Sequence, residues 1–326
     1  MVQFNGFCGC AYYRTPGQTV QTSERGHTLA YLFNTESENG YHEPRTHESF
    51  IRCGEEAENK KSNDGKQCTV FGVKGLSWFS YMQPFNIIRG VAIDYMHCVL
   101  LGIVKMHLTL WFDKTHRNEP FSIAPRISEV DKRLLAIKPP SFITRFPRSL
   151  TEIAHFKAAE LKNFLLFYSL PCLVGILPEE QFLHFSLLVF STYKLLQDRI
   201  SSRDLIHCRQ MILEFVLNVP VLYGERYSTS NVHLLLHLVD KVEDLGPLWS
   251  SSCFYFEDFN GQLRRLFHGT QHIERQIAFA VSVHQSLPEL LQVLKPGTSE
   301  RGLFLNLTEK KPHTTSEHIC DGVYAV

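Results

Sequence analysis

Apolar residues recur every three to four positions through the middle of the chain, which is the spacing of one face of an α-helix. The first such stretch runs from Asp94 to Trp111, and Asp94 stands where the N-cap of that helix is expected. Further helical patterns cover residues 151–170, 179–200, 202–217 and 229–245, with short gaps at Pro171, Pro178, Ser201 and Pro220. Long amphipathic helices joined by short loops predict a mainly α fold, an antiparallel helical array.

The segments on either side of this helical body have a different character. The acidic stretch from Glu36 to Asp64 is expected to form a surface loop within an irregular, partly extended flank. Near the other end, a β-prone run at Cys253–Phe256 passes into a helix that bears Glu257, and a polar, loose tail follows. The chain is therefore predicted to have four parts: a Cys-containing flank (1–90), the helical domain (91–245), a strand-helix segment (246–290) and a loose tail (291–326).

Composition narrows the class of protein. The 33 Lys and Arg balance the 33 Asp and Glu, which excludes a protein that binds nucleic acid through overall positive charge, so any DNA contact must come from a local patch. The 44% of hydrophobic residues exclude a disordered chain, and nine scattered cysteines predict reduced thiols. No signal peptide pattern and no apolar run long enough to span a bilayer are present, so an intracellular protein without a membrane partner is expected.

Two pairs of residues have the chemistry of metal ligands. His233 and His237 are four residues apart in a helical pattern, so both imidazoles can reach one ion. Cys8 and Cys10 form a C-x-C pair that can supply thiolates to the same ion. The alternative is structural: two histidines on a Leu-rich helix, and two ordinary thiols in a turn. No Glu follows His233 directly, which excludes the His-Glu-x-x-His motif of zinc proteases.

Carboxylates at helix starts are the second set of candidates. Asp94 and His97 are three residues apart and can hydrogen-bond to each other, although a helix cap beside a polar neighbour would give the same pattern. Glu257 stands between the β-prone run and the following helix, where a carboxylate can bind Mg²⁺. The alternative for Glu257 is an ordinary solvated surface residue.

Basic residues gather in one predicted loop and at one further position. The loop contains no acid between its first and last basic residue, so it is the predicted site of phosphate contact, with solvated charge as the alternative. Its members are Lys132, Arg133, Lys138, Arg145 and Arg148, and a second basic pair is Arg264 and Arg265.

Ordered motifs across about residues 3–285 resemble one known family. They are, in chain order, Phe4-Asn-Gly-Phe-Cys-Gly-Cys10, Arg45-Thr-His47, Gly72-Val-Lys-Gly75, Asp94-Tyr-Met-His97, Pro139-Pro-Ser-Phe-Ile-Thr-Arg145, Phe156-Lys-Ala-Ala-Glu160, Asn231-Val-His233, Gly246-Pro-Leu-Trp249 and Phe254-Tyr-Phe-Glu257. Their order resembles the downstream part of a CACTA (En/Spm-type) DNA transposase with a Tnp2-like region. The resemblance implies a helical insertion into an RNase H-like core, a nuclear location, and DNA, another copy of the chain or a full-length transposase as partners.

The resemblance also implies roles for particular residues. The family cleaves and rejoins DNA with two Mg²⁺ held by an Asp, Asp, Glu set, in which Glu257 matches the third acid and Asp94 and His97 match a D-x-x-H signature. His233 and His237 match a pair that, with an upstream Cys pair, clips the insertion to the core through zinc. Tyr13 stands in place of the second Cys of that pair, so Cys8 would supply the second thiolate ligand beside Cys10.

One departure from the family changes the expected activity. The first two catalytic Asp of the family lie upstream of the Cys region, whereas this chain has only nine residues before Cys10. A single carboxylate does not hold two Mg²⁺, so we expect a transposase-derived fragment without autonomous nuclease activity that retains DNA or partner binding. The alternatives are a helical protein–protein interaction module, and an active Mg²⁺-dependent transposase completed by an upstream segment.

Overall fold

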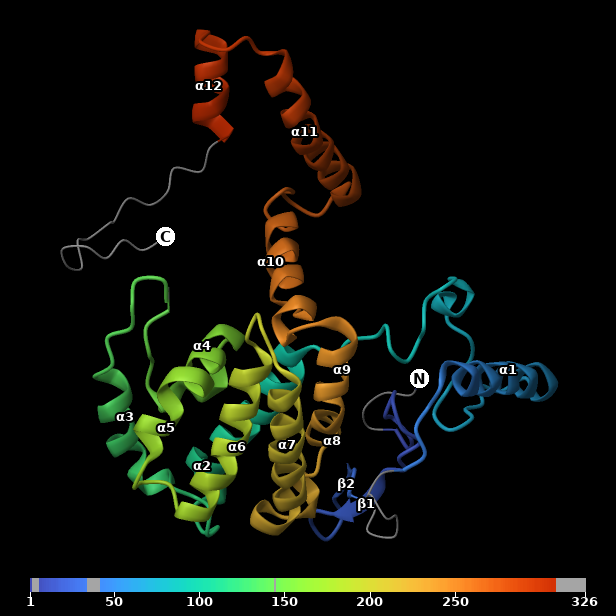
Figure 1. Ribbon diagram of the computed structural model, residues 1–326, viewed down its shortest axis with the longest axis vertical. Coiled ribbons are helices and arrows are strands. Elements are labelled where there is room, and N and C mark those ends of the chain that lie inside the picture. The colour runs from blue at the N-terminus through green and yellow to red at the C-terminus, as the bar shows by residue number, and fades with distance from the viewer. Residues whose placement is uncertain (2–5, 34–41, 144, 309–326) are drawn as a thin grey trace. The chain divides into compact units, whose positions relative to one another are not determined.

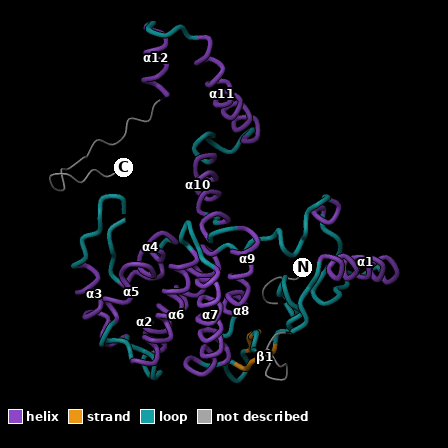
Figure 2. The backbone as a smooth tube through the Cα atoms, in the orientation of Figure 1, coloured by secondary structure: helices purple, strands orange, loops and turns teal. Residues whose placement is uncertain are grey.

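The computed structural model describes residues 1, 6–33, 42–143 and 145–308, without the side chain of Asp64. The chain divides into two compact units after Phe254, which falls within the predicted segment 246–290. The described residues are mainly helical, and their only sheet is the antiparallel hairpin of β1 (Gln18–Gln21) and β2 (His27–Ala30) (Figures 1 and 2). The prediction of a mainly α fold is confirmed, whereas its RNase H-like part is not confirmed by the described residues.

Helices follow one another closely through the first unit. The α-helices are α1 (His47–Asp64), α2 (Lys105–Phe112), α3 (Ile127–Leu135), α4 (Ala158–Asn163), α5 (Ser169–Leu173), α6 (Glu179–Leu195), α7 (Ser202–Tyr223), α8 (Ser230–Leu234) and α9 (Leu238–Leu245). The π-helical segments are η2 (Met96–Val104) and η6 (Phe164–Tyr168). The 3-10 turns are η1 (Trp78–Tyr81), η3 (Lys114–His116), η4 (Ala124–Arg126), η5 (Leu150–His155), η7 (Glu225–Tyr227), η8 (Leu235–His237) and η9 (Leu248–Ser251).

Helices α6 and α7 lie side by side at the centre of this unit (Figure 1). The turn between them ends in a capping box, in which the Ser201 hydroxyl accepts from the Asp204 N–H at 3.1 Å and the Asp204 carboxylate accepts from the Ser201 N–H at 3.2 Å. Both residues therefore define the start of α7, as the gap at Ser201 predicts.

Aromatic rings fill the core between these helices. Trp111 from α2 meets Phe185 from α6 edge-to-face with ring centroids 4.9 Å apart, and both are fully buried with Phe215 from α7. Among the described residues, α7 is the one helix long and apolar enough to cross a membrane by length and composition. Its residues Cys208 and Phe215 are fully buried in this core, and 28% of its apolar window is buried in all.

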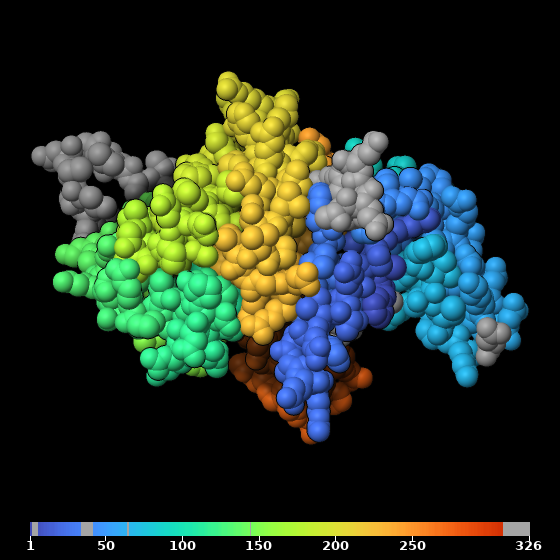
Figure 3. All heavy atoms as spheres, turned by 90° about the horizontal axis from the view of Figure 1, so that it is seen from below, coloured from blue at the N-terminus to red at the C-terminus, as the bar shows by residue number. Residues whose placement is uncertain are grey.

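The N-terminal flank packs against η7, α8, η8 and α9, where the blue residues meet the amber ones near the middle of Figure 3. The Tyr31 N–H, just after β2, donates to the Ser228 carbonyl at 2.7 Å. On the opposite side of α8, a Cβ at Gly102 would lie 2.4 Å from the Asn231 side-chain nitrogen. Glycine at this position therefore allows α8 to approach η2 closely, and α8 carries His233.

The prediction of a surface loop for the acidic stretch is wrong over residues 47–64, which form α1. Thr46 caps this helix through a capping box with Ser49. Phe50, Cys53 and Ala57 are buried on one face of α1. Together with Val70 and Val73 they form a small hydrophobic cluster that is separate from the main core. The many charged residues of α1 are on its outer face, where Glu and Lys are good helix formers, so their polarity misled the prediction. Residues 36–41 of the predicted loop lie outside the described residues.

Three further boundaries differ from the predictions. Pro220 does not end α7, which continues for three more residues because Val219 and Tyr223 are buried in the core. The predicted helix over 151–170 is instead broken after η5, since Phe156 and Lys157 are extended. Pro171, expected to lie in a gap, falls inside α5, which continues directly from η6, so this proline does not end the helical stretch.

The second unit contains most of α10 (Phe254–Leu263), together with α11 (Ile273–Val293) and α12 (Ser299–Thr308). None of the described residues in these helices is buried. The β-prone prediction for Cys253–Phe256 is wrong, because α10 begins at Phe254. The tail predicted as loose contains α12, and its residues 309–326 lie outside the described part.

Two histidines are buried together inside the aromatic core. His107 Nδ1 donates to the Ile103 carbonyl at 2.9 Å, and His184 Nε2 donates to the Phe215 carbonyl at 2.8 Å, so each ring is neutral and held in one tautomer. Burial lowers the pKa of His107 to about 3 and that of His184 to about 4. Both are therefore uncharged over the whole physiological range.

These two groups predict a loss of stability in acid. Their pKa values are lower in the folded chain than the ordinary value of 6.5, so the unfolded chain binds more protons below pH 6.5 and the free energy of unfolding falls as pH decreases from there toward 4. Between about pH 7 and pH 4.5, the free energy of unfolding of His184→Gln should fall by about 2 kcal/mol less than that of the wild type. Urea unfolding at several pH values measures this difference. The exposed His207→Gln serves as the control. An unchanged acid dependence in His184→Gln would refute the assignment.

Candidate metal centre

The two predicted histidine ligands project from neighbouring turns of one helical stretch. Thr229 caps α8 by accepting from the Val232 N–H, and His233 lies in this helix. The 3-10 turn η8 then places His237 directly before α9. Both side chains are at least nine-tenths buried, with 6% of His233 and 1% of His237 exposed. The four-residue spacing therefore brings the two imidazoles to one buried face, as predicted.

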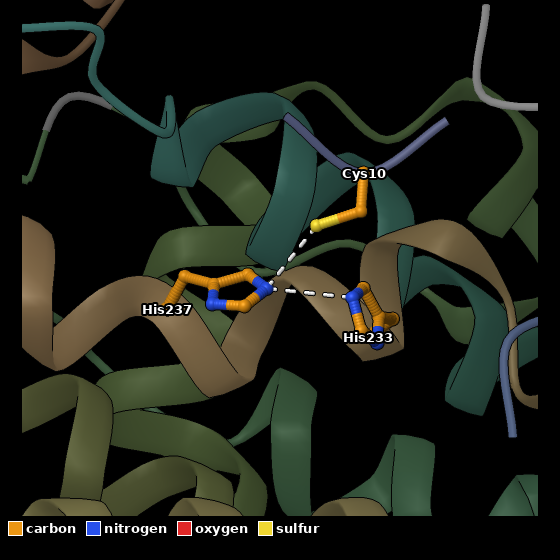
Figure 4. A group of neighbouring side chains, drawn as sticks. All are labelled: Cys10, His233 and His237. Atoms are coloured by element: carbon orange, nitrogen blue, oxygen red, sulfur yellow. Dashed lines mark hydrogen bonds between the residues drawn. The ribbon is translucent and has the colours of Figure 1, made fainter. Parts of the chain in front are cut away.

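Cys10 reaches the same face from the N-terminal flank. Its Sγ lies 3.3 Å from His237 Nε2, which in turn lies 3.4 Å from His233 Nε2 (Figure 4). One ligand atom from each of the three residues lies within 4.8 Å of the other two. We call Cys10, His233 and His237 the buried triad. Its members are separated by 227 residues of sequence at the widest, so only the fold brings them together.

The backbone around Cys10 is shaped to stabilise a thiolate. The N–H groups of Tyr12 and Tyr13 both donate to Cys10 Sγ, at 3.4 and 3.3 Å. Burial raises the pKa of the Cys10 thiol, while these two N–H groups and the nearby Arg45 guanidinium oppose the rise. A cation bound at the sulfur would be the strongest stabiliser of its ionised form.

The imidazoles are held in the neutral form that a metal ion requires. Burial lowers the pKa of His233 to about 4 and that of His237 well below its ordinary value. The Tyr13 ring is stacked on His237 with centroids 4.8 Å apart, and the Tyr31 ring is stacked on His233 at 5.5 Å. Tyr13 and Tyr31 therefore cover the two imidazoles with aromatic rings.

Cys8, the fourth predicted ligand, is not brought into the triad. It has a positive φ of 58°, and its carbonyl oxygen would be 2.3 Å from a Cβ at Gly72. The close passage of the glycine backbone, together with a hydrogen bond from Arg45 Nη2 to the same carbonyl at 3.4 Å, fixes this residue beside the 70–73 turn. The structure thus contains three of the four predicted ligands in one group.

Arg45 holds the ligand loop and was not among the predicted site residues. Its guanidinium donates to the carbonyls of Cys10 at 3.0 Å, Tyr13 at 3.2 Å and Phe71 at 2.6 Å. Only 4% of Arg45 is exposed. With the carbonyl of Cys8, Arg45 binds four carbonyls from two separate loops. The sequence around Arg45 does not indicate this role, because the loops meet only in the folded chain.

A second group of ligand-type side chains forms around Asp94. The Asp94 carboxylate, His97 Nδ1 and Cys253 Sγ lie within 4.8 Å of one another. Asp94 Oδ1 accepts from the N–H groups of Met96 at 3.1 Å and Cys253 at 3.0 Å, and Oδ2 accepts from the His97 N–H at 3.2 Å and contacts His97 Nδ1. The predicted N-cap at Asp94 is therefore confirmed, and Cys253 joins a pair that the sequence predicts without it.

The remaining predicted acid lies in the second unit. Glu257 occupies the first turn of α10 and is exposed. Arg264 and Arg265 follow the end of α10 and are exposed as well.

The prediction of a basic loop is wrong for Lys132 and Arg133, which lie in the last turn of α3, and part of the basic charge is used for internal contacts. Arg148 pairs with Glu160, with its Nε 2.6 Å from Oε1, and Arg133 Nη1 donates to the Val174 carbonyl at 2.7 Å. Lys132, Lys138 and Arg145 are exposed. Arg145 also lies 4.0 Å from Glu160, so three of the five charges contact the helical body, although Arg145 is exposed as well.

Comparisons with known proteins add no relative: no protein-family model, no curated protein and no solved structure matches this chain. What the triad can bind therefore follows from its own geometry.

Removing the Arg45 side chain is expected to be strongly destabilising. Arg45→Met leaves several buried carbonyls without their donor, which predicts a loss of more than about 2 kcal/mol in the free energy of unfolding, measured by urea titration. Arg209→Met is the matched control, because that guanidinium pairs with Asp240 and Glu243, which are 40% and 48% exposed, and its loss should cost less than about 1 kcal/mol. Equal losses in the two variants would contradict the role of Arg45.

Proposed function

We propose that this chain is a helical module of En/Spm-type transposase origin, fastened by a structural zinc ion, that binds DNA and does not cleave it by itself. The observation that carries the proposal is the buried triad, in which a thiol and two imidazoles from the two ends of the first unit converge. The resemblance in the motifs supplies the origin, and the exposed basic residues supply the DNA contact.

The spacing of the triad fits zinc. Zn–S bonds of about 2.3 Å and Zn–N bonds of about 2.0–2.1 Å at tetrahedral angles separate S from N by about 3.5 Å and N from N by about 3.4 Å. The observed separations are 3.3 Å between Cys10 Sγ and His237 Nε2 and 3.4 Å between the two Nε2 atoms. Sulfur and imidazole donors favour zinc over Mg²⁺ or Ca²⁺, which prefer oxygen.

Such an ion would fasten the N-terminal flank to the helical body. It would join Cys10 to the α8–η8 stretch, so the free energy of metal binding would add to the stability of the folded chain. Three protein ligands leave one coordination position for a water molecule or another small ligand.

We expect one zinc per chain to survive dialysis, measured by elemental analysis. Cys10→Ser and His237→Gln should each retain less than about a tenth of it, because a buried site cannot replace a lost ligand from solvent. Chelation should lower the thermal midpoint of the wild type by several degrees and leave both variants unchanged. Cys68→Ser is the control thiol. A zinc content of zero in folded wild-type protein would remove the proposed ion.

The proposal of binding without cleavage is supported by the acids of the first unit. Among the described residues of this unit, the two groups of ligand-type side chains contain a single carboxylate, that of Asp94, and three backbone N–H groups donate to its oxygens. Two Mg²⁺ ions require several carboxylates. The alternative of an active transposase would therefore need acids from outside this unit.

The exposed basic residues are the proposed DNA contact, and the nuclear location that we propose follows from the transposase resemblance. Lys132, Lys138 and Arg145 are exposed, although Arg145 also lies 4.0 Å from Glu160. Arg133 and Arg148 bind within the protein. Phosphate contacts by three side chains give affinity that falls steeply with salt.

We expect the triple variant Lys132→Glu/Lys138→Glu/Arg145→Glu to bind duplex DNA at least about tenfold more weakly, with a salt dependence smaller by about three released ions. Fluorescence anisotropy of a labelled duplex at several salt concentrations measures both. Lys60→Glu/Lys61→Glu on α1 is a control for charge reversal on another exposed surface. Wild-type protein that does not bind DNA at low salt would remove the DNA claim.

A second candidate function is favoured by an apolar groove between α6 and α7. The groove has a volume of about 730 Å³ and includes Phe190, Tyr193 and Met211 among its lining residues. Phe190 is 53% exposed and Tyr193 47% exposed. Exposed aromatic rings of this kind are typical of protein-binding surfaces. A protein partner that stays bound at high salt after nuclease treatment, and is lost in Phe190→Ser, would support a protein–protein interaction module.

A further inference from the structure

We propose that Asp94, His97 and Cys253 form a second metal site, which takes a divalent cation of the zinc or cobalt type and exchanges it with solvent. One side-chain oxygen, one nitrogen and one sulfur lie within 4.8 Å of one another in this group. Two of the ligands come from the turn that begins the 95–112 helix, and the third lies next to α10 in sequence. The site is independent of the buried triad and of the proposed function.

The carboxylate is held in place before any ion binds. Three backbone N–H groups, from Met96, His97 and Cys253, donate to the two Asp94 oxygens. These three hydrogen bonds fix the plane of the carboxylate and bring the backbone at Cys253 to the start of the helix. Oδ2 also contacts His97 Nδ1, so a metal ion can bind these two atoms in place of the hydrogen bond between them.

The charges balance for a divalent ion. One carboxylate and one thiolate neutralise a 2+ ion, and the imidazole binds as a neutral ligand. The proton of the Cys253 thiol leaves to solvent when its sulfur binds the ion.

The mixture of donors selects the kind of metal. Mg²⁺ and Ca²⁺ prefer oxygen ligands, whereas an oxygen, nitrogen and sulfur set suits Zn²⁺ and Co²⁺. Access differs sharply from that of the triad, because the His97 side chain is 55% exposed and the Asp94 side chain 17% exposed. An ion can therefore enter and leave without unfolding of the surrounding helices.

The experiment is a Co²⁺ titration of the metal-free full chain, followed by the thiolate-to-cobalt absorption in the near ultraviolet and the visible bands of the ion. We expect the wild type to bind two equivalents, one tightly and one more weakly. His97→Gln should weaken the second step at least about tenfold and leave the first unchanged. Cys253→Ser should remove about half of the thiolate-to-cobalt absorption.

Matched controls are His155→Gln and Cys68→Ser, which remove an exposed histidine and a partly exposed thiol elsewhere. His97 is exposed, so its variant tests the site even if Cys253→Ser does not fold. Binding of two equivalents by His97→Gln with unchanged affinity, or of only the triad's equivalent by the wild type, overturns the proposal. If the wild type shows no tight binding step but does show a weaker step that His97→Gln abolishes, the zinc of the proposed function is refuted and the second metal site is supported.

Discussion

The contact between Cys10 and His237 joins parts of the chain that are 227 residues apart. The N-terminal flank contributes one thiol, the α8–η8 stretch contributes two imidazoles, and all three side chains are buried. Thiol and imidazole groups in a dry interior have few partners that satisfy them, and a bound cation is the one that satisfies all three at once. The triad and the apolar contacts of Cys10 and Tyr12 with the main core together join the flank to the helical body.

Two other polar features support that arrangement. Arg45 binds the carbonyls of the ligand loop and of the 70–73 turn, so the backbone that presents Cys10 is held from outside the triad. Gly102 lets α8 lie close enough to η2 for Asn231 to occupy the space of a missing Cβ. The buried side chain of Arg45 and the close packing of α8 on η2 thus hold the residues of the triad in place before any metal is considered.

The Asp94 group shows how one residue can serve fold and chemistry together. Its carboxylate caps the helix that starts at Tyr95 and also binds the N–H of Cys253, so it links the start of the helical body to the residues before α10. A carboxylate committed in this way is poorly suited to hold paired Mg²⁺, yet it is well fixed for a single ion shared with an imidazole and a thiolate. This reassigns a motif that the family resemblance links to DNA cleavage.

The sequence by itself determined the helical class, the start of α7 at Ser201, the N-cap at Asp94 and the pairing of His233 with His237, because each depends on residues within one or two helical turns. It did not determine α1, whose outer charges hide a short apolar face, or the continuation of α7 past Pro220, where core burial outweighs a local rule. The choice of Cys10 over Cys8, the role of Arg45 and the place of Cys253 beside Asp94 were decided by tertiary structure alone. Each of these is a contact between residues far apart in sequence, and no local spacing records which distant segments will meet.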